Sequence, residues 1–255
     1  MSDSLRFACT GCGKCCSGHH VPLTLVESQR WARDGGQVIV LIEAFVVDGP
    51  GMPPEQREHV LLRSHAVPSA DGQIRVSVTF AAFNPGRCRY LDDNDLCAIY
   101  DKRPLVCRIY PVEINPHIPL RPEGKDCPPE AWQQGPELIH GTQLVDAQLQ
   151  ALVQASRQAD REDIAAKVAV CHALGMTTSA LKGNGFTAYL PDMHAFATAL
   201  AELPQDIWGS WALHVEDAAL QAQLQAHGVQ VTDQPRFYYA FMGFLGRGRF
   251  AAPAM

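Results

Sequence analysis

Cysteine is the residue type that most constrains this chain. Nine cysteines occur among 255 residues, and all except Cys171 lie in the first half. These eight are Cys9, Cys12, Cys15, Cys16, Cys88, Cys97, Cys107 and Cys127. Thiolates repel one another unless a cation holds them, so in a reducing compartment this concentration indicates bound metal or redox chemistry rather than ordinary buried side chains. Cys171 shares an apolar helical face with Ile164 and Val168, which predicts a small buried hydrophobe.

Charge and composition exclude several other classes of protein. With 47% hydrophobic and 19% charged residues, the chain has ample material for a core. A net charge of −6 and a pI near 5.9 give no chain-wide positive field for DNA or RNA. The N-terminal residues lack the regions of a secretory signal, and no window approaches the ~18 apolar residues that span a bilayer. We therefore expect a cytoplasmic protein with neither a nucleic-acid nor a membrane partner.

The pattern of elements predicts an α+β fold. The glycines between the first cysteines disfavour a regular helix, a helix after Thr24 should stop at Gly35, and residues 38–47 and 74–80 read as strands. Beyond about residue 135 the composition shifts to Ala, Leu and Gln. We expect an irregular, metal-organised cysteine-cluster domain over residues 1–135 and a mainly helical C-terminal region over residues 136–255.

Apolar spacing predicts the individual helices of the C-terminal region. Two amphipathic helices are expected, one around Val145 to Val153 and one around Ile164 to Cys171. A third should carry Phe196, Leu200 and Leu203, and a fourth Leu213, Leu220 and Leu224. No complete glycine-rich cofactor loop follows a predicted strand, so a standard Rossmann methyltransferase site is not predicted.

The first cysteine motif favours an iron-sulfur centre. Cys9, Cys12 and Cys15 have the two-residue spacing of three ligands in bacterial-type iron-sulfur runs, where a tight loop directs successive sulfurs at one cluster. A remote fourth cysteine would complete the set. Cys127-Pro128 resembles the Cys-Pro that ends such runs, although it lies far away in sequence.

Zinc is the alternative, because eight thiolates also divide into two tetrahedral sites of four sulfurs each. The separations between Cys88, Cys97 and Cys107 are longer than those of a zinc-knuckle pair. The adjacent Cys15 and Cys16 can rarely direct both sulfurs at one small ion. These two features favour iron-sulfur and leave zinc open.

Other polar residues near the cysteines have two interpretations each. Four arginines interleave the second cysteine segment, namely Arg87, Arg89, Arg103 and Arg108. Their guanidinium groups would offset the negative charge of a thiolate centre, or Arg103 could pair locally with Asp95 or Asp101. Tyr100 and Tyr110 could donate hydrogen bonds to sulfur or be ordinary core residues. The imidazole of His19 or His20 could add a nitrogen ligand, or the pair could lie in an exposed loop.

Both cysteine segments resemble a known family. Residues 7–16, Phe-Ala-Cys-Thr-Gly-Cys-Gly-Lys-Cys-Cys, together with Cys88-Arg89-Tyr90-Leu91, Cys97-Ala98-Ile99-Tyr100, Arg103-Pro104 and Cys107-Arg108-Ile109-Tyr110-Pro111, are similar to the CxxCxxCC zinc- or iron-chelating domain. The resemblance covers roughly residues 5 to 130. It implies a metal or iron-sulfur centre held by Cys9, Cys12, Cys15, Cys16, Cys88, Cys97 and Cys107, with Cys127 where such domains often place one more cysteine.

Three functions follow from this reading. The first is a metal-binding protein that holds a [4Fe-4S] cluster or zinc and has a redox or chelating role. The second is an enzyme, because the family is similar to flagellin lysine-N-methylases, which use S-adenosylmethionine to methylate protein lysines. The third is a zinc-stabilised module that binds a protein partner. The C-terminal region carries none of the motif.

Overall fold

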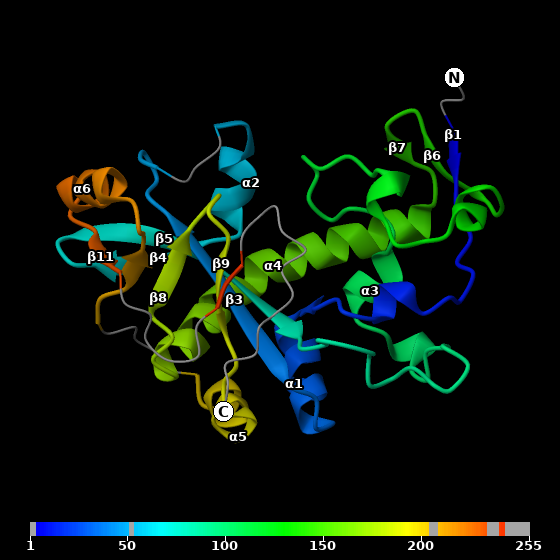
Figure 1. Ribbon diagram of the computed structural model, residues 1–255, viewed down its shortest axis with the longest axis horizontal. Coiled ribbons are helices and arrows are strands. Elements are labelled where there is room, and N and C mark those ends of the chain that lie inside the picture. The colour runs from blue at the N-terminus through cyan, green and yellow to red at the C-terminus, as the bar shows by residue number, and fades with distance from the viewer. Residues whose placement is uncertain (1–3, 51–53, 204–208, 234–239, 243–255) are drawn as a thin grey trace. The chain divides into compact units, whose positions relative to one another are not determined.

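The computed structural model describes residues 4–50, 54–203, 209–233 and 240–242 (Figure 1). The chain folds as two compact units, and neither is continuous in sequence. Unit 1 consists of residues 1–24 and 83–159, and unit 2 consists of residues 25–82 and 160–255. The division predicted from the sequence, a cysteine-cluster domain over residues 1–135 followed by a C-terminal region, stays a prediction.

Unit 1 contains little regular structure. Its elements are β1 (Ser4–Arg6), β2 (Val21–Leu23), α3 (Leu105–Ile109), β6 (Glu137–His140), β7 (Gln143–Leu144) and the first half of α4 (Ala147–Ala173). Strands β1, β6 and β7 form a small antiparallel sheet in that order. Single turns of 3-10 helix and loops account for most of the remaining chain, as expected for a segment rich in glycine, proline and cysteine.

Unit 2 is built on a mixed sheet. Its strands are β3 (Val38–Phe45), β4 (His65–Ser69), β5 (Gly72–Ala82), β8 (Thr178–Leu181), β9 (Phe186–Tyr189), β10 (Ala212–His214), β11 (Gln230–Thr232) and β12 (Ala240–Met242). The order β11-β10-β8-β3-β5 is extended by β4 on β5, by β9 on β3 and by β12 on β9. Along this row, β11 is parallel to β10, β10 to β8 and β8 to β3, whereas β3 and β5 pair antiparallel.

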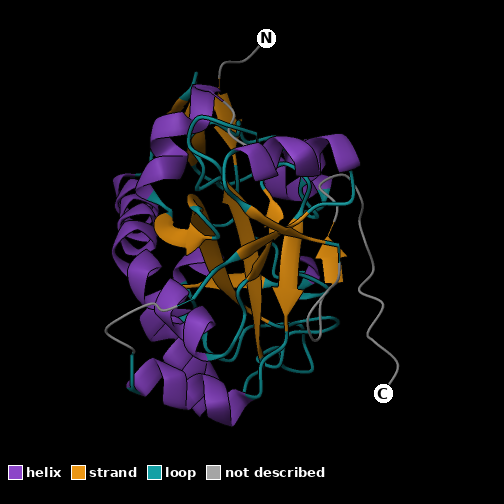
Figure 2. Ribbon diagram, turned by 90° about the vertical axis from the view of Figure 1, so that its left-hand side faces the viewer, coloured by secondary structure: helices purple, strands orange, loops and turns teal. Residues whose placement is uncertain are grey.

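Helices pack on this sheet, which Figure 2 shows as orange strands beside purple helices. They are α1 (Leu25–Arg33), α2 (Arg57–Leu62), α5 (Met193–Ala201), α6 (Ala218–Ala226) and the second half of α4. Helix α1 contacts α5, β3 and β5, and α6 contacts β11. Strand β3 is buried along almost its whole length, while β5 alternates buried and half-buried residues as its sequence predicts. The α+β prediction is therefore confirmed.

Helix α5 carries Phe196 and Leu200 as predicted but ends at Ala201, before Leu203, and the other helix predictions for the C-terminal region are corrected at two places. Residues 147–153 and the stretch around Ile164 to Cys171 belong to one continuous helix, α4, because residues 154–163 contain no glycine or proline that would end it, and Val145 lies just before the helix begins. Leu213 lies in β10, and α6 begins only after Asp217, whose carboxylate accepts a hydrogen bond from the Leu220 amide at 2.7 Å. Leu213 and Leu220 have helical spacing in the sequence, but they belong to two different elements, β10 and α6.

Cys171 is fully buried in α4, as predicted, and burial raises the pKa of its thiol.

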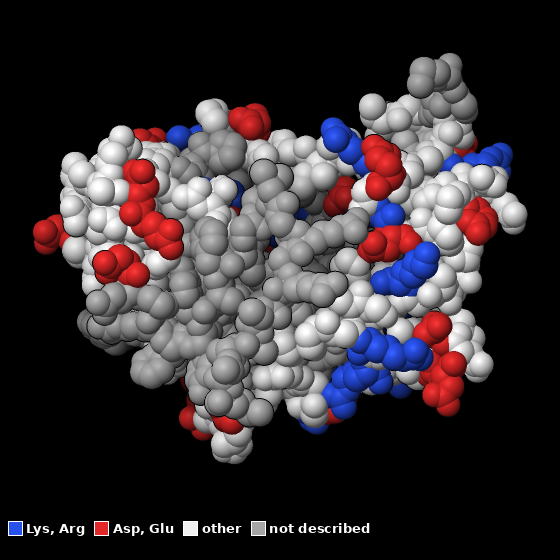
Figure 3. Space-filling view, in the orientation of Figure 1, with Lys and Arg blue, Asp and Glu red and all other residues white. Residues whose placement is uncertain are grey.

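No helix in the described part of the chain is both long enough and apolar enough to cross a bilayer. On the face seen in Figure 3, basic and acidic side chains lie side by side on the right, and acidic side chains predominate on the left.

Candidate metal centre

All eight cysteines of the two motifs belong to unit 1. Main-chain hydrogen bonds join the two segments that carry them. The Cys88 amide donates to the Cys16 carbonyl at 2.7 Å, and the Gly18 amide donates to the Gly86 carbonyl at 2.7 Å. Residues 16–18 therefore lie beside residues 86–88, although about 70 residues separate them along the chain.

Glycine shapes the first cysteine loop at Gly13. Its φ of +66° lies in the left-handed region, and it is the residue from which the 3-10 turn Lys14–Cys16 begins. A Cβ there would lie 3.0 Å from Cβ of Asp95. Both the backbone conformation and the close neighbour require glycine, and the resulting turn exposes the sulfurs of Cys15 and Cys16 to the second segment.

The second segment forms a hairpin and then a short helix. The Ala98 amide donates to the Tyr90 carbonyl at 2.8 Å, which brings Cys97 back toward Cys88. Pro104 then separates a 3-10 turn at Tyr100–Lys102 from α3, which carries Cys107. Proline at this point ends the first turn and favours the start of the second, as the sequence predicts.

The sulfurs of Cys15 and Cys16 are 3.9 Å apart. A hydrogen bond between these two thiols lowers the pKa of Cys16 to about 6, helped by the positive charges of Arg103 and His19. The same hydrogen bond, together with burial, raises the pKa of Cys15. The Cys16 thiol is thus the member of the pair that ionises more readily, and the thiolate is the form that binds metal.

The other thiols feel one another's charge as well. Burial, together with the neighbouring charges of Cys16, Cys88 and Cys97, raises the pKa of Cys107 to about 12. Burial likewise raises the pKa of Cys127, to which the charges of Cys12 and Cys9 contribute. These neighbouring thiols resist ionisation as long as no cation is bound. A bound metal ion would favour their thiolate forms and release the protons.

Two of the four arginines act on these sulfurs. The charge of Arg103 favours the thiolates of Cys16 and Cys107, and Arg89 does the same for Cys88. The guanidinium of Arg103 lies 3.6 Å from the centre of the Tyr100 ring, and its Nε donates to the Tyr100 carbonyl at 2.8 Å. The expected local pair with aspartate instead forms at Arg87, which donates to Asp95 at 2.6 Å.

Tyr110 and His19 lie near Cys127. The Tyr110 hydroxyl oxygen and the Cys127 sulfur are 3.5 Å apart and share a hydrogen bond that favours the Cys127 thiolate. His19 Nε2 lies 2.6 Å from a carboxylate oxygen of Asp126, and both side chains are about half exposed, which agrees with the exposed-loop interpretation of His19. Sequence reasoning named Tyr110 and His19 but missed Asp126, whose only signal is its position next to a cysteine.

Gly135 fixes the N-terminal segment that leads into Cys9. It has a φ of +91°, and a Cβ there would lie 2.5 Å from the Phe7 carbonyl oxygen and 2.7 Å from Cβ of Ala8. We expect Gly135→Ala to lower the free energy of unfolding by about 2–4 kcal/mol, because the strained φ and the backbone clash add. Gly141→Ala is the matched control, since φ is +59° but nothing lies within 4 Å. Denaturant titration measures both, and equal losses would contradict the clash.

The donor set fits zinc or an iron-sulfur centre in its chemistry. None of the nine cysteines forms a disulfide. Within residues 4–50, 54–203, 209–233 and 240–242, no three histidine, cysteine or acidic side chains are already placed so that they could hold one metal ion. The thiols are thus gathered into one unit, and closing them around a metal requires adjustments of side-chain rotamers or loops.

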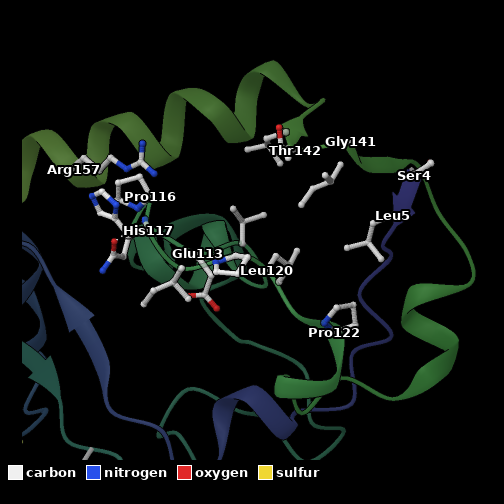
Figure 4. Close-up of a pocket in the computed structure, with 16 residues that line it drawn as sticks. Ser4, Leu5, Glu113, Pro116, His117, Leu120, Pro122, Gly141, Thr142 and Arg157 are labelled. Carbon is white, nitrogen blue, oxygen red and sulfur yellow. Dashed lines mark hydrogen bonds between the residues drawn. The ribbon is translucent and has the colours of Figure 1, made fainter. Parts of the chain in front are cut away.

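Unit 1 also contains a cavity of about 730 Å³, shown in Figure 4. Ser4 and Leu5 of β1, Pro116 and His117 of the loop after α3, and Arg157 of α4 lie around it. Arg157 Nε donates to the Ile114 carbonyl at 2.7 Å, which ties α4 to that loop. The cavity is lined by none of the eight cysteines, and sequence reasoning missed it because its residues come from four separate stretches of chain.

Unit 1 is therefore a loop-rich, cysteine-rich unit that gathers eight thiols from two distant segments. Residues 8–128 match the model of the CxxCxxCC family, described as a "putative zinc- or iron-chelating domain". The resemblance seen in the motifs is confirmed over nearly the same residues. No curated protein and no solved structure matches the chain.

Proposed function

We propose that this is a metal-binding protein whose eight clustered cysteines hold iron-sulfur centres of the [4Fe-4S] type, with a redox or metal-chelating role. The observation that carries the proposal is the assembly of these cysteines, none in a disulfide, within one compact unit. The ligands are Cys9, Cys12, Cys15, Cys16, Cys88, Cys97, Cys107 and Cys127. When bound, such a cluster exchanges single electrons at a potential tuned by its surroundings.

Two observations favour iron-sulfur over zinc. The separations between Cys88, Cys97 and Cys107 in the sequence are longer than those of a zinc-knuckle pair. The spacing of Cys9, Cys12 and Cys15 is also that of iron-sulfur runs. The charges of Arg89 and Arg103 would offset part of the cluster's negative charge.

Anaerobic purification followed by elemental analysis and a visible spectrum tests the proposal. We expect iron and sulfide in the protein and a brown colour. Zinc in a colourless protein would contradict the iron-sulfur assignment and favour a zinc-stabilised module that binds a protein partner. A folded protein with neither metal would contradict metal binding itself.

Tyr110→Phe is expected to shift the potential of the centre that includes Cys127. A hydrogen bond from the hydroxyl to sulfur would stabilise the reduced cluster, which is more negative, more than the oxidised cluster. Without the hydroxyl the reduction potential should therefore become more negative by about 20–60 mV, equivalent to ~0.5–1.5 kcal/mol. Redox titration of the anaerobic protein measures it. Tyr100→Phe is the control, because Tyr100 is exposed and its ring stacks on Arg103. Equal shifts in both variants would contradict a specific role of the Tyr110 hydroxyl.

Methyl transfer from S-adenosylmethionine to a protein lysine stays a prediction of the family resemblance. Its check is equilibrium binding of S-adenosylmethionine to the metal-loaded protein. Binding would support the enzymatic alternative, and absence of binding would count against it.

A further inference from the structure

We propose that the eight cysteines form two separate four-thiolate metal centres that meet at the Cys15–Cys16 pair. Centre A takes Cys9, Cys12, Cys15 and Cys127, and centre B takes Cys16, Cys88, Cys97 and Cys107. The inference rests on the proposed function, because it assumes that these cysteines bind metal. It goes beyond that function by assigning which cysteines share a metal.

The members of centre B are brought together by the second segment. The Cys88 amide donates to the Cys16 carbonyl at 2.7 Å, so these two residues are direct neighbours. The bridge between Leu91 and Cys97 turns the chain back and returns Cys97 to the same place. The Cys107 thiol on α3 then feels the charges of Cys16, Cys88 and Cys97, which places it within electrostatic reach of all three.

The members of centre A are brought together at the N-terminal segment. The Ala8 amide donates to the Ala131 carbonyl at 2.8 Å, and the rings of Phe7 and Trp132 pack with their centres 4.9 Å apart. These contacts place Cys9 close to the turn Pro129–Trp132, which begins two residues after Cys127.

The thiols of centre A interact with one another in the same way. Cys127 feels the charges of Cys12 and Cys9, and Cys15 feels those of Cys9 and Cys127. Most of these cysteine–cysteine interactions connect members of the same set. The pair Cys15–Cys16 is the one that connects a member of centre A with a member of centre B. Each set has four thiols, which is the number of ligands that a [4Fe-4S] cluster or a structural zinc ion takes.

The local structure explains how adjacent cysteines can serve different centres. Cys15 and Cys16 lie in a 3-10 turn, in which successive Cα–Cβ bonds point about 120° apart. Their sulfurs lie 3.9 Å apart, so binding at two centres requires at least one of the two side chains to change its rotamer. Adjacent side chains in such a turn leave the backbone in different directions, so that one can face Cys127 and the other Cys88. The surroundings differ as well, because centre B has Arg89 and Arg103 nearby, whereas centre A has the Tyr110 hydroxyl.

Stepwise removal of metal from the anaerobically purified wild-type chain tests the division. A chelator is added in increments, the freed thiols are alkylated, and mass spectrometry maps each alkylated cysteine while the metal per chain is counted. We expect four cysteines to become reactive together when half of the metal has left, and the other four afterwards. Centre A should lose its metal first, because Cys9 and Cys12 are exposed. Release of all eight together, or in other groupings, would overturn the division.

Single substitutions give a second readout on the full chain. Cys12→Ala should lose half of the metal and leave the centre B cysteines protected from alkylation, and Cys97→Ala should do the reverse. Cys171→Ala is the matched control and should keep all of the metal, because Cys171 is buried in unit 2. Loss of all metal in both single variants would overturn the division while leaving metal binding intact. A wild-type chain without metal would overturn the proposed function as well.

Discussion

Removing the metal is expected to unfold unit 1 and leave unit 2 folded. The buried hydrophobic side chains of the described residues lie mainly in unit 2, and unit 1 contributes Leu23, Ile109, Ala131, Leu138 and Val153. A unit with so small a core depends on other sources of stability. Structural zinc supplies about 10–16 kcal/mol of binding free energy in zinc-finger peptides at neutral pH, and that binding energy is also folding energy.

Hydrogen exchange of the full chain, measured by mass spectrometry before and after anaerobic chelation, checks this expectation. Amides of residues 83–135 should lose protection by several orders of magnitude. Amides of β3 and β5 are the internal control, since their strands are paired along their length within unit 2. Unchanged protection in unit 1 after complete loss of metal would contradict a metal-dependent fold.

Phe196→Ala is expected to destabilise unit 2 without changing the metal content. Phe196 is completely buried in α5, and its ring lies 5.1 Å from that of Phe80 in an edge-to-face arrangement at 72°. Removing a buried phenyl ring costs about 3–5 kcal/mol, because the apolar surface is lost and a cavity remains. Thermal and denaturant unfolding measure the loss.

Phe196→Leu is the matched control for this prediction. Leucine keeps most of the apolar volume and loses the aromatic pair, so the cost should fall to about 1–2 kcal/mol. A loss of metal in Phe196→Ala under conditions where the chain is still folded would contradict the independence of the two units' stabilities.

Local chemistry made much of unit 1's loop structure predictable. Glycine around the first cysteines indicated tight turns, and Pro104 indicated the break between two helical turns, because these residues restrict the backbone wherever they occur. Helix α1, which ends at Arg33 shortly before Gly35, and the strands β3 and β5 followed from capping residues, an apolar run and alternating apolar residues. The single helix α4 was missed because polar residues in its middle hid its continuity.

The sequence by itself determined that eight cysteines are concentrated in two segments and that Cys171 stands apart in an apolar helical face, since residue type and spacing carry that information. Only the tertiary structure decided which cysteines become neighbours. Cys127 is brought near Cys9 by the hydrogen bond between Ala8 and Ala131, and Cys88 is brought near Cys16 by the hydrogen bond between their main chains. Contacts between residues so far apart in the chain depend on how whole segments pair, and no local pattern of residues encodes that pairing.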